Sequence, residues 1–193
     1  MKDDTSFARL VSLACHDLRT PLATVHGFAA TLSKTMELAP PADRYVEMIE
    51  AASRQLAELL DELSVAARIE GGRYDPAVRE VDTLALAQAA AERLGEDRVR
   101  VTGRGEVVET DVEAVDRGVS ALVQAALRHG GLDEVEVAVA GRELRVAPVT
   151  ESSAKVVLGQ DLRDLGAGVA VRLLEARGGA VSVSGSTLTI RLA

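Results

Sequence analysis

The chain has 193 residues, of which 47% are apolar, and a formal net charge of −8. This length accommodates one ordinary domain or two small ones with packed cores. Lys and Arg do not form runs, which argues against nucleic-acid binding, because phosphate contacts need grouped cations. No apolar stretch approaches the roughly 20 residues of a membrane span, so we expect no membrane partner. Cys15 is the only cysteine, which excludes an intrachain disulfide and favours a cytoplasmic location.

Residues 5–36 predict one long helix, because their apolar residues are spaced by alternating threes and fours. This stripe consists of Phe7, Val11, Ala14, Leu18, Leu22, Val25, Ala29 and Leu32. Pro40 and Pro41 then separate it from a second helix over 42–69, whose apolar stripe is wide enough to face two neighbours. A lone pair of helices would leave these stripes partly exposed. We therefore expect residues 1–72 to form an antiparallel helical hairpin that pairs with a second copy as a homodimeric four-helix bundle.

Residues 75–193 predict a second domain of different architecture. Short strands are expected at 78–81, 99–101, 106–110, 135–139, 144–146, 181–183 and 188–190. Asp82 and Asp111 are placed to N-cap helices ending near Gly95 and His129, and a third helix runs to Gly178. Residues 150–160 are expected to form a loop. The fold class is α+β: a helical hairpin followed by a two-layer α/β sandwich.

His16 is the first candidate functional residue. At 100° per residue it lies opposite the apolar stripe, on a face whose other members include Ser12, Thr20, Ala23 and Gly27. These small neighbours leave room for a partner. A neutral imidazole can accept a phosphoryl group on one ring nitrogen, and the adjacent Asp17 can orient the other. Thr20 could hydrogen-bond an attacking water.

Two further residues of this helix are interpreted as structural. His26 fits no motif, and we expect it to be an exposed helix residue. Cys15 is expected to be a half-buried packing residue rather than a nucleophile, because no positive group is placed to lower its pKa.

The run His16-Asp17-Leu18-Arg19-Thr20-Pro21-Leu22 resembles the H-box of the histidine-kinase dimerisation and phosphotransfer domain. The resemblance implies that His16 is the phosphoacceptor and Asp17 its general base. Thr20 matches the residue that positions water when such proteins dephosphorylate a partner. The partner implied is the receiver domain of a response regulator, which we expect to dock on the face that carries the other candidate residues, Ser12, Arg19, Ala23 and Gly27.

Residues 78–193 resemble the ATP-binding domain of the same family, with three departures. Ala125 stands where the resemblance places a magnesium-coordinating Asn, and residues 147–151 lack the family's Asp-x-Gly-x-Gly. The family's third motif is a Gly-x-Gly-Leu that precedes a helix and holds phosphates, and residues 164–168 lie at that place. Asp164 stands where a glycine is expected, so Gly166 and Gly168 are interpreted as a remnant of this motif. The lid is shortened to about 151–160. We therefore expect a degenerate histidine-kinase-type domain that binds no ATP and no metal, with any Mg²⁺ held by the receiver.

Three functions are compatible with these features. The first is a phosphorelay histidine phosphotransferase, in which His16 takes a phosphoryl group from one receiver aspartate and passes it to another. The second is an autophosphorylating histidine kinase with a divergent ATP site. The third is a non-catalytic pseudokinase scaffold that docks a receiver. The intact His16, Asp17 and Thr20 favour chemistry over docking alone, and the eroded nucleotide site favours the phosphotransferase.

Overall fold

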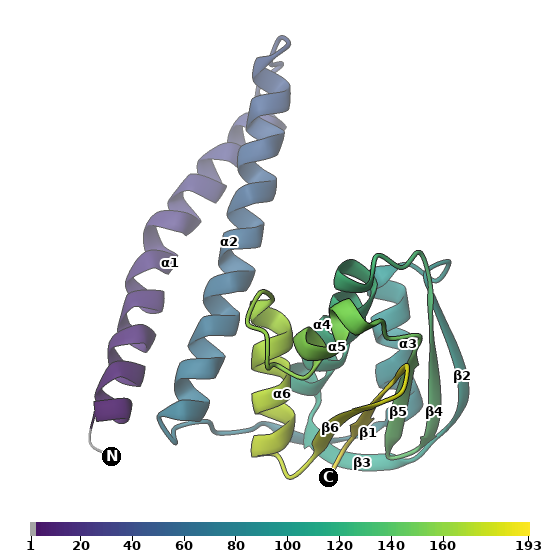
Figure 1. Ribbon diagram of the computed structural model, residues 1–193. Helices are drawn as coiled ribbons and strands as arrows, with labels where there is room; N and C mark the ends of the chain where they lie inside the picture. Colours follow the sequence, from purple (N-terminus) through teal and green to yellow (C-terminus); the bar gives the residue numbers. More distant parts are fainter. Residues whose placement is uncertain (1–2) are drawn as a thin grey trace. The chain divides into compact units, whose positions relative to one another are not determined.

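The computed structural model describes residues 3–193 and divides into two compact units, Met1–Tyr74 and Asp75–Ala193. The first two residues of the predicted hairpin domain lie outside the described part. Unit 1 consists of two long helices, and unit 2 combines helices with a β-sheet (Figure 1). The predicted α+β fold class is confirmed. No helix among the described residues is long and apolar enough to cross a membrane.

Unit 1 is an antiparallel pair of helices. α1 spans Asp3–Thr35 and α2 spans Ala42–Glu70, close to the predicted bounds. Pro41 is the N-cap of α2, as expected for a residue that can begin a helix but not continue one. At the other end, the backbone N–H of Gly71 bonds the carbonyl of Ala67 at 3.0 Å. These two residues therefore set the limits of α2.

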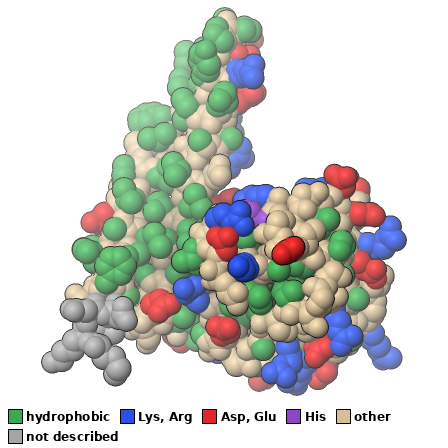
Figure 2. All heavy atoms as spheres, in the orientation of Figure 1, with side chains coloured by type: hydrophobic (Ala, Val, Ile, Leu, Met, Phe, Trp, Pro, Cys, Tyr) green, Lys and Arg blue, Asp and Glu red, His purple; other side chains and the backbone are tan. Residues whose placement is uncertain are grey.

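The apolar stripe of α1 is only partly buried by α2. Cys15 and Ala29 of α1 and Val46 of α2 are buried, and the two helices pack on each other. Figure 2 shows hydrophobic side chains along much of the visible face of the hairpin. The exposed apolar residues of unit 1 include Phe7, Leu10, Leu18, Val25, Phe28, Leu32, Tyr45, Met48, Ile49, Leu56, Leu59 and Leu63. One face of the hairpin is thus apolar and uncovered within a single chain.

Unit 2 contains a five-stranded sheet of order β2-β4-β5-β7-β6 and a two-stranded sheet of β1 with β3. The strands are β1 Val78–Asp82, β2 Val99–Gly105, β3 Val107–Asp111, β4 Val135–Gly141, β5 Glu143–Ala147, β6 Ala180–Ser184 and β7 Thr187–Arg191. β2 pairs with β4 in parallel, and every other pair is antiparallel. Gly141, with φ of 60°, makes the turn between β4 and β5.

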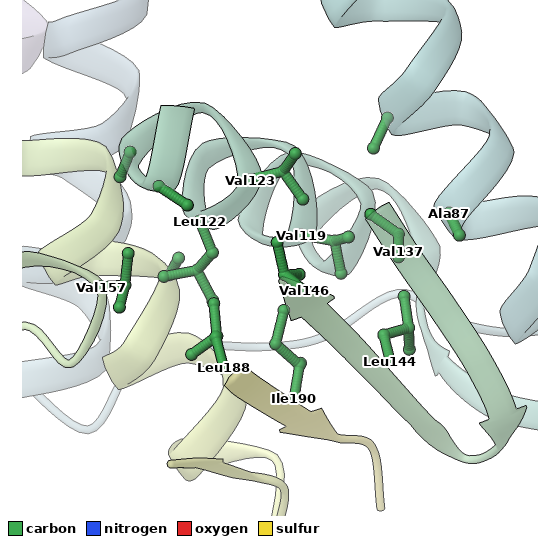
Figure 3. Packing of buried hydrophobic residues seen from close by; sticks show 14 of the residues in the cluster. Ala87, Val119, Leu122, Val123, Val137, Leu144, Val146, Val157, Leu188 and Ile190 are labelled. Carbon is green, nitrogen blue, oxygen red and sulfur yellow. The ribbon is translucent and has the colours of Figure 1, made fainter. Parts of the chain in front are cut away.

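Helices cover one face of the larger sheet and form the core with it (Figure 3). They are α3 Thr83–Leu94, α4 Val112–Gly130 and α6 Leu165–Ala176. The side chains of Asp82, Asp111 and Asp164 accept hydrogen bonds from the first turns, so each is an N-cap. Alternate residues of the strands, such as Val137 and Val146, are fully buried against these helices.

The expectation of a loop from Thr150 to Gln160 is wrong, because α5 spans Glu151–Val157. The helix begins with a capping box in which Thr150 and Ser153 exchange side-chain to backbone hydrogen bonds. Its last residues, Val156 and Val157, are fully buried in the core of unit 2. Capping and burial therefore order a segment whose sequence is a poor helix former.

Candidate functional site

His16 lies on the exposed side of α1, with 77% of its side chain accessible. Its Nδ1 is 3.1 Å from Oδ1 of Asp17, which is also largely exposed. Because an ionised carboxylate only accepts hydrogen bonds, this contact favours the tautomer with the proton on Nδ1. Nε2 is then left with a free lone pair facing solvent. The arrangement suits an imidazole that acts as a nucleophile.

The residues near His16 on the same side of α1 have small side chains and are mostly exposed. Thr20 and Ala23 are exposed on the same side of α1. A Cβ built at Gly27 would meet nothing within 4 Å, so no packing inside the chain requires glycine there. Ser12 is the candidate that is engaged already, since its hydroxyl accepts a hydrogen bond from Arg73 at 3.3 Å. A partner surface can therefore approach the imidazole from the Ala23 and Gly27 side.

Arg19 bonds Asp61 of α2 at 2.6 Å, with both side chains about half exposed. The pair borders a groove of about 360 Å³ between α1 and α2. Arg54 and Glu58 of α2 line the same groove and have no ion-pair or hydrogen-bond partner among the described residues. The groove thus presents one free cation and one free anion about two turns of α1 from His16.

His26 also lines this groove, and the expectation that it is exposed is wrong. The residue is half-buried, and its Nδ1 is buried without a hydrogen-bond partner. The signal was present in the sequence: His26 follows Leu22 by four residues and precedes Ala29 by three, so it continues the side that contacts α2. Sequence reasoning missed it because a histidine was assumed to face solvent.

Cys15 is buried more completely than expected, with 1% of its surface accessible. Burial raises the pKa of its thiol, and the nearby Arg19 guanidinium only partly opposes this effect. A thiol that stays protonated and covered is a packing residue. Its position beside His16 in the sequence therefore gives it no part in the chemistry.

The residues expected to mark a degenerate nucleotide site lie in unit 2. Ala125 has no accessible surface and belongs to the core, and Gly168 is buried within α6. Gly166 lies in the first turn of α6, next to Asp164, whose carboxylate N-caps the helix. Among the residues that the structure describes, no three His, Cys, Asp or Glu side chains converge as metal ligands. Ala125 therefore offers no side-chain oxygen to a metal, and the carboxylate of Asp164 lies at the first turn of α6.

Comparison with known proteins identifies the hairpin. Residues 8–72 match the family model of the His Kinase A (phospho-acceptor) domain. The sensor protein IrlS of Burkholderia pseudomallei is 32% identical over 138 residues, which are 65% of this chain and 29% of that protein. The sensor histidine kinase TrcS of Mycobacterium tuberculosis is 33% identical over 70 residues, 36% of this chain and 14% of its own length. The chain thus spans less than a third of either curated relative.

Solved structures share the fold across both units. A crystal structure of full-length ShkA in complex with AMPPNP superposes with a TM-score of 0.70 at 19% identity, covering 94% of this chain and 44% of ShkA. The histidine kinase AdeS of Acinetobacter baumannii gives a TM-score of 0.58 at 16% identity, covering 92% of this chain and 97% of that one. At these identities the likeness concerns the fold: two long helices followed by an ATPase-like α/β domain.

Proposed function

We propose that this chain is a phosphorelay histidine phosphotransferase, because residues 8–72 match the phosphoacceptor-domain model and the fold resembles that of histidine kinases. His16 takes a phosphoryl group from the aspartate of a response-regulator receiver domain and passes it to a second receiver. The observation that carries this proposal is the contrast between two sites. His16 is exposed and oriented by Asp17, whereas Ala125 is buried where a metal ligand would be needed.

The transfer step needs only groups that this chain and a receiver supply. Nε2 of His16 attacks the phosphorus of the aspartyl phosphate, the P–O bond to the aspartate breaks, and a P–N bond forms. The proton on Nδ1 stays in place, and the Asp17 carboxylate offsets the positive charge that develops on the ring. The reverse step returns the phosphoryl group to an aspartate. The receiver's own acidic pocket holds the Mg²⁺.

The docking surface proposed for the receiver is the polar side of unit 1 that carries His16. Arg19 and Ala23 line the groove on its α1 side, and Gly27 is exposed one turn after Ala23. The free charges of Arg54 and Glu58 offer contacts that distinguish one receiver from another. Ser12, held by Arg73, forms the opposite edge.

Transfer from a phosphorylated receiver tests the proposal. A panel of receiver domains is charged with labelled acetyl phosphate, freed of the donor, and mixed with the chain. At least one receiver should lose label to the wild-type chain and none to His16→Gln. Lys34→Gln is the control, because it changes another exposed residue of the same helix that does not line the groove, and this variant should still accept label. If no receiver transfers label to the wild type, the phosphotransferase proposal fails and the scaffold alternative gains support.

An autophosphorylating kinase is the second candidate. It is favoured by the similarity to IrlS, whose 138 aligned residues are too many to lie within the hairpin alone. Incubation of the chain with γ-labelled ATP and Mg²⁺ separates the two functions. The phosphotransferase proposal expects no label on His16 under these conditions. Acid-labile, base-stable label that is absent from His16→Gln would support the kinase instead.

A further inference from the structure

Both carboxylate oxygens of Asp164 are engaged inside unit 2. Oδ1 accepts a hydrogen bond from the backbone N–H of Ala167 at 3.0 Å, in the first turn of α6. Oδ2 lies 2.9 Å from Nε2 of His129 and 3.7 Å from the guanidinium of Arg128. Only 12% of the Asp164 side chain and 17% of the His129 side chain are accessible. This largely buried contact between a carboxylate and an imidazole joins the end of α4 to the start of α6.

His129 connects a third element to the same point. Its backbone carbonyl accepts a hydrogen bond from the hydroxyl of Ser152 at 2.8 Å, in the first turn of α5. The side chain of His129 therefore holds α6 while its main chain holds α5. Because His129 is in the last turn of α4, all three helix ends meet at one residue.

The helices that meet at His129 contribute fully buried residues to the core of unit 2. Val156 and Val157 of α5 have no accessible surface, and neither has Ala125 on α4. All three belong to the continuous core of unit 2. α5 packs on both α4 and α6. The segment that would have to open for a nucleotide is therefore part of the core.

We infer that unit 2 closes its own anion site: Asp164 takes the position of an anionic ligand at the start of α6, and His129 locks α4, α5 and α6 around it. A helix N-terminus attracts anions through its free N–H groups and its dipole, and here the Asp164 carboxylate already bonds the N–H of Ala167 and places a negative charge at the positive end of the dipole. A second anion would meet a fixed negative charge. The inference goes beyond the proposed function, because it concerns unit 2 and does not depend on transfer through His16.

Amide hydrogen exchange of the full chain, read by mass spectrometry, tests the lock. Asp164→Asn keeps a side chain that can still cap α6 but removes the charge, and His129→Gln removes the other half of the pair. Each should speed exchange in residues 151–170 by about tenfold, because one change leaves a buried polar group without its partner. The double variant should exchange no faster than either single variant. Asp161→Asn is the matched control, because Asp161 pairs with Arg163 in the same segment.

Two outcomes of this experiment would overturn the lock. One is exchange at the wild-type rate in Asp164→Asn or His129→Gln. The other is a double variant whose effect is the sum of the single effects, since that would show two independent contributions rather than one pair. An equal effect of Asp161→Asn would likewise contradict a special role of Asp164.

Inorganic pyrophosphate tests the closed site. At millimolar concentration it should leave exchange in the wild-type chain unchanged, and it should slow exchange at residues 165–168 in Asp164→Ala, where the N–H groups of α6 are freed. Slower exchange in the wild-type chain with pyrophosphate or Mg²⁺-ATP would overturn the inference. It would also be overturned if pyrophosphate slowed exchange in neither the wild type nor Asp164→Ala. Transfer from a receiver to His16 is measured separately, so a failure in unit 2 is distinguishable from a failure of the relay.

Discussion

At the scale of single residues, Thr20 offers a way to separate transfer from dephosphorylation. Its hydroxyl is exposed four residues after His16, on the same side of α1. Thr20→Ala should slow dephosphorylation of a bound receiver about tenfold, because a group that positions the attacking water is lost. Transfer of label to His16 should change less than twofold, since Thr20 does not contact the imidazole. The measurement is the decay of labelled receiver with and without the chain.

Thr24→Ala is the control for Thr20→Ala. Thr24 is also exposed on α1, but it lies eight residues from His16 and its hydroxyl already donates to the carbonyl of Thr20 at 3.1 Å. The role given to Thr20 would be contradicted by equal losses in the two variants, or by an unchanged dephosphorylation rate in Thr20→Ala.

Cys15 gives a second prediction at this scale. Because it is buried and its pKa is raised, the native thiol should react with iodoacetamide at pH 8 at least about 100-fold more slowly than in 8 M urea. Intact mass measured over time checks the two rates. Adding a single exposed cysteine by Ser33→Cys provides the reference for a reactive thiol on the same helix. Comparable rates for Cys15 and that reference would show that the α1–α2 contact opens readily.

Local chemistry explains which residues of the candidate site could be predicted. His16 and Asp17 are adjacent in the chain, so their contact follows from sequence alone. The Arg19–Asp61 pair joins residues 42 positions apart. No acidic residue lies four positions from Arg19, so helical spacing did not predict an ion pair for it. The burial of His26 and the contact of His129 with Asp164 also depend on how helices pack. Contacts between side chains of different helices therefore could not be predicted from residue spacing within one helix.

At the scale of elements, α5 is expected to be held by burial rather than by its intrinsic propensity. Val156→Ala removes two buried methyl groups from the core and should destabilise unit 2 by about 2 kcal/mol. For a domain of this size that lowers the melting temperature by about 10 °C. Thermal unfolding followed by circular dichroism measures the change. Lys155→Ala is the control, because the neighbouring Lys155 is exposed, and a similar loss in both variants would contradict this account.

The long helices could be predicted from the sequence and α5 could not, and the length of each helix explains both outcomes. α1, α2 and α4 contain several turns of apolar residues at helical spacing, and Asp82 and Asp111 mark two helix starts. α5 has seven residues, which is too short for a period to be recognised. Its sequence Glu-Ser-Ser-Ala-Lys-Val-Val combines strong helix formers with Ser and Val, which are weaker, so the capping box at Thr150 is the main sequence signal for this helix.

At the scale of the whole molecule, the uncovered apolar face of unit 1 leads us to propose a second copy as its partner. Val25 follows His16 by nine residues on α1, and nine steps of 100° place it on the opposite side of the helix. Val25 and Leu56 are about half exposed in the single chain, although both are apolar. Pairing two hairpins through this face would bury them in a four-helix bundle and leave His16 accessible to a receiver.

This arrangement makes the oligomeric state sensitive to one charge. Leu56→Glu should weaken self-association at least about 100-fold, because each dimer would bury the altered position twice and each lost leucine contact is worth about 2 kcal/mol. Sedimentation equilibrium should give a dimer for the wild type and a monomer for Leu56→Glu, with helix content retained. Gln55→Glu adds the same charge at the preceding position of α2, which is exposed, and this variant should remain dimeric. A monomeric wild type, or a dimeric Leu56→Glu, would mean that this face is covered by something other than a second copy.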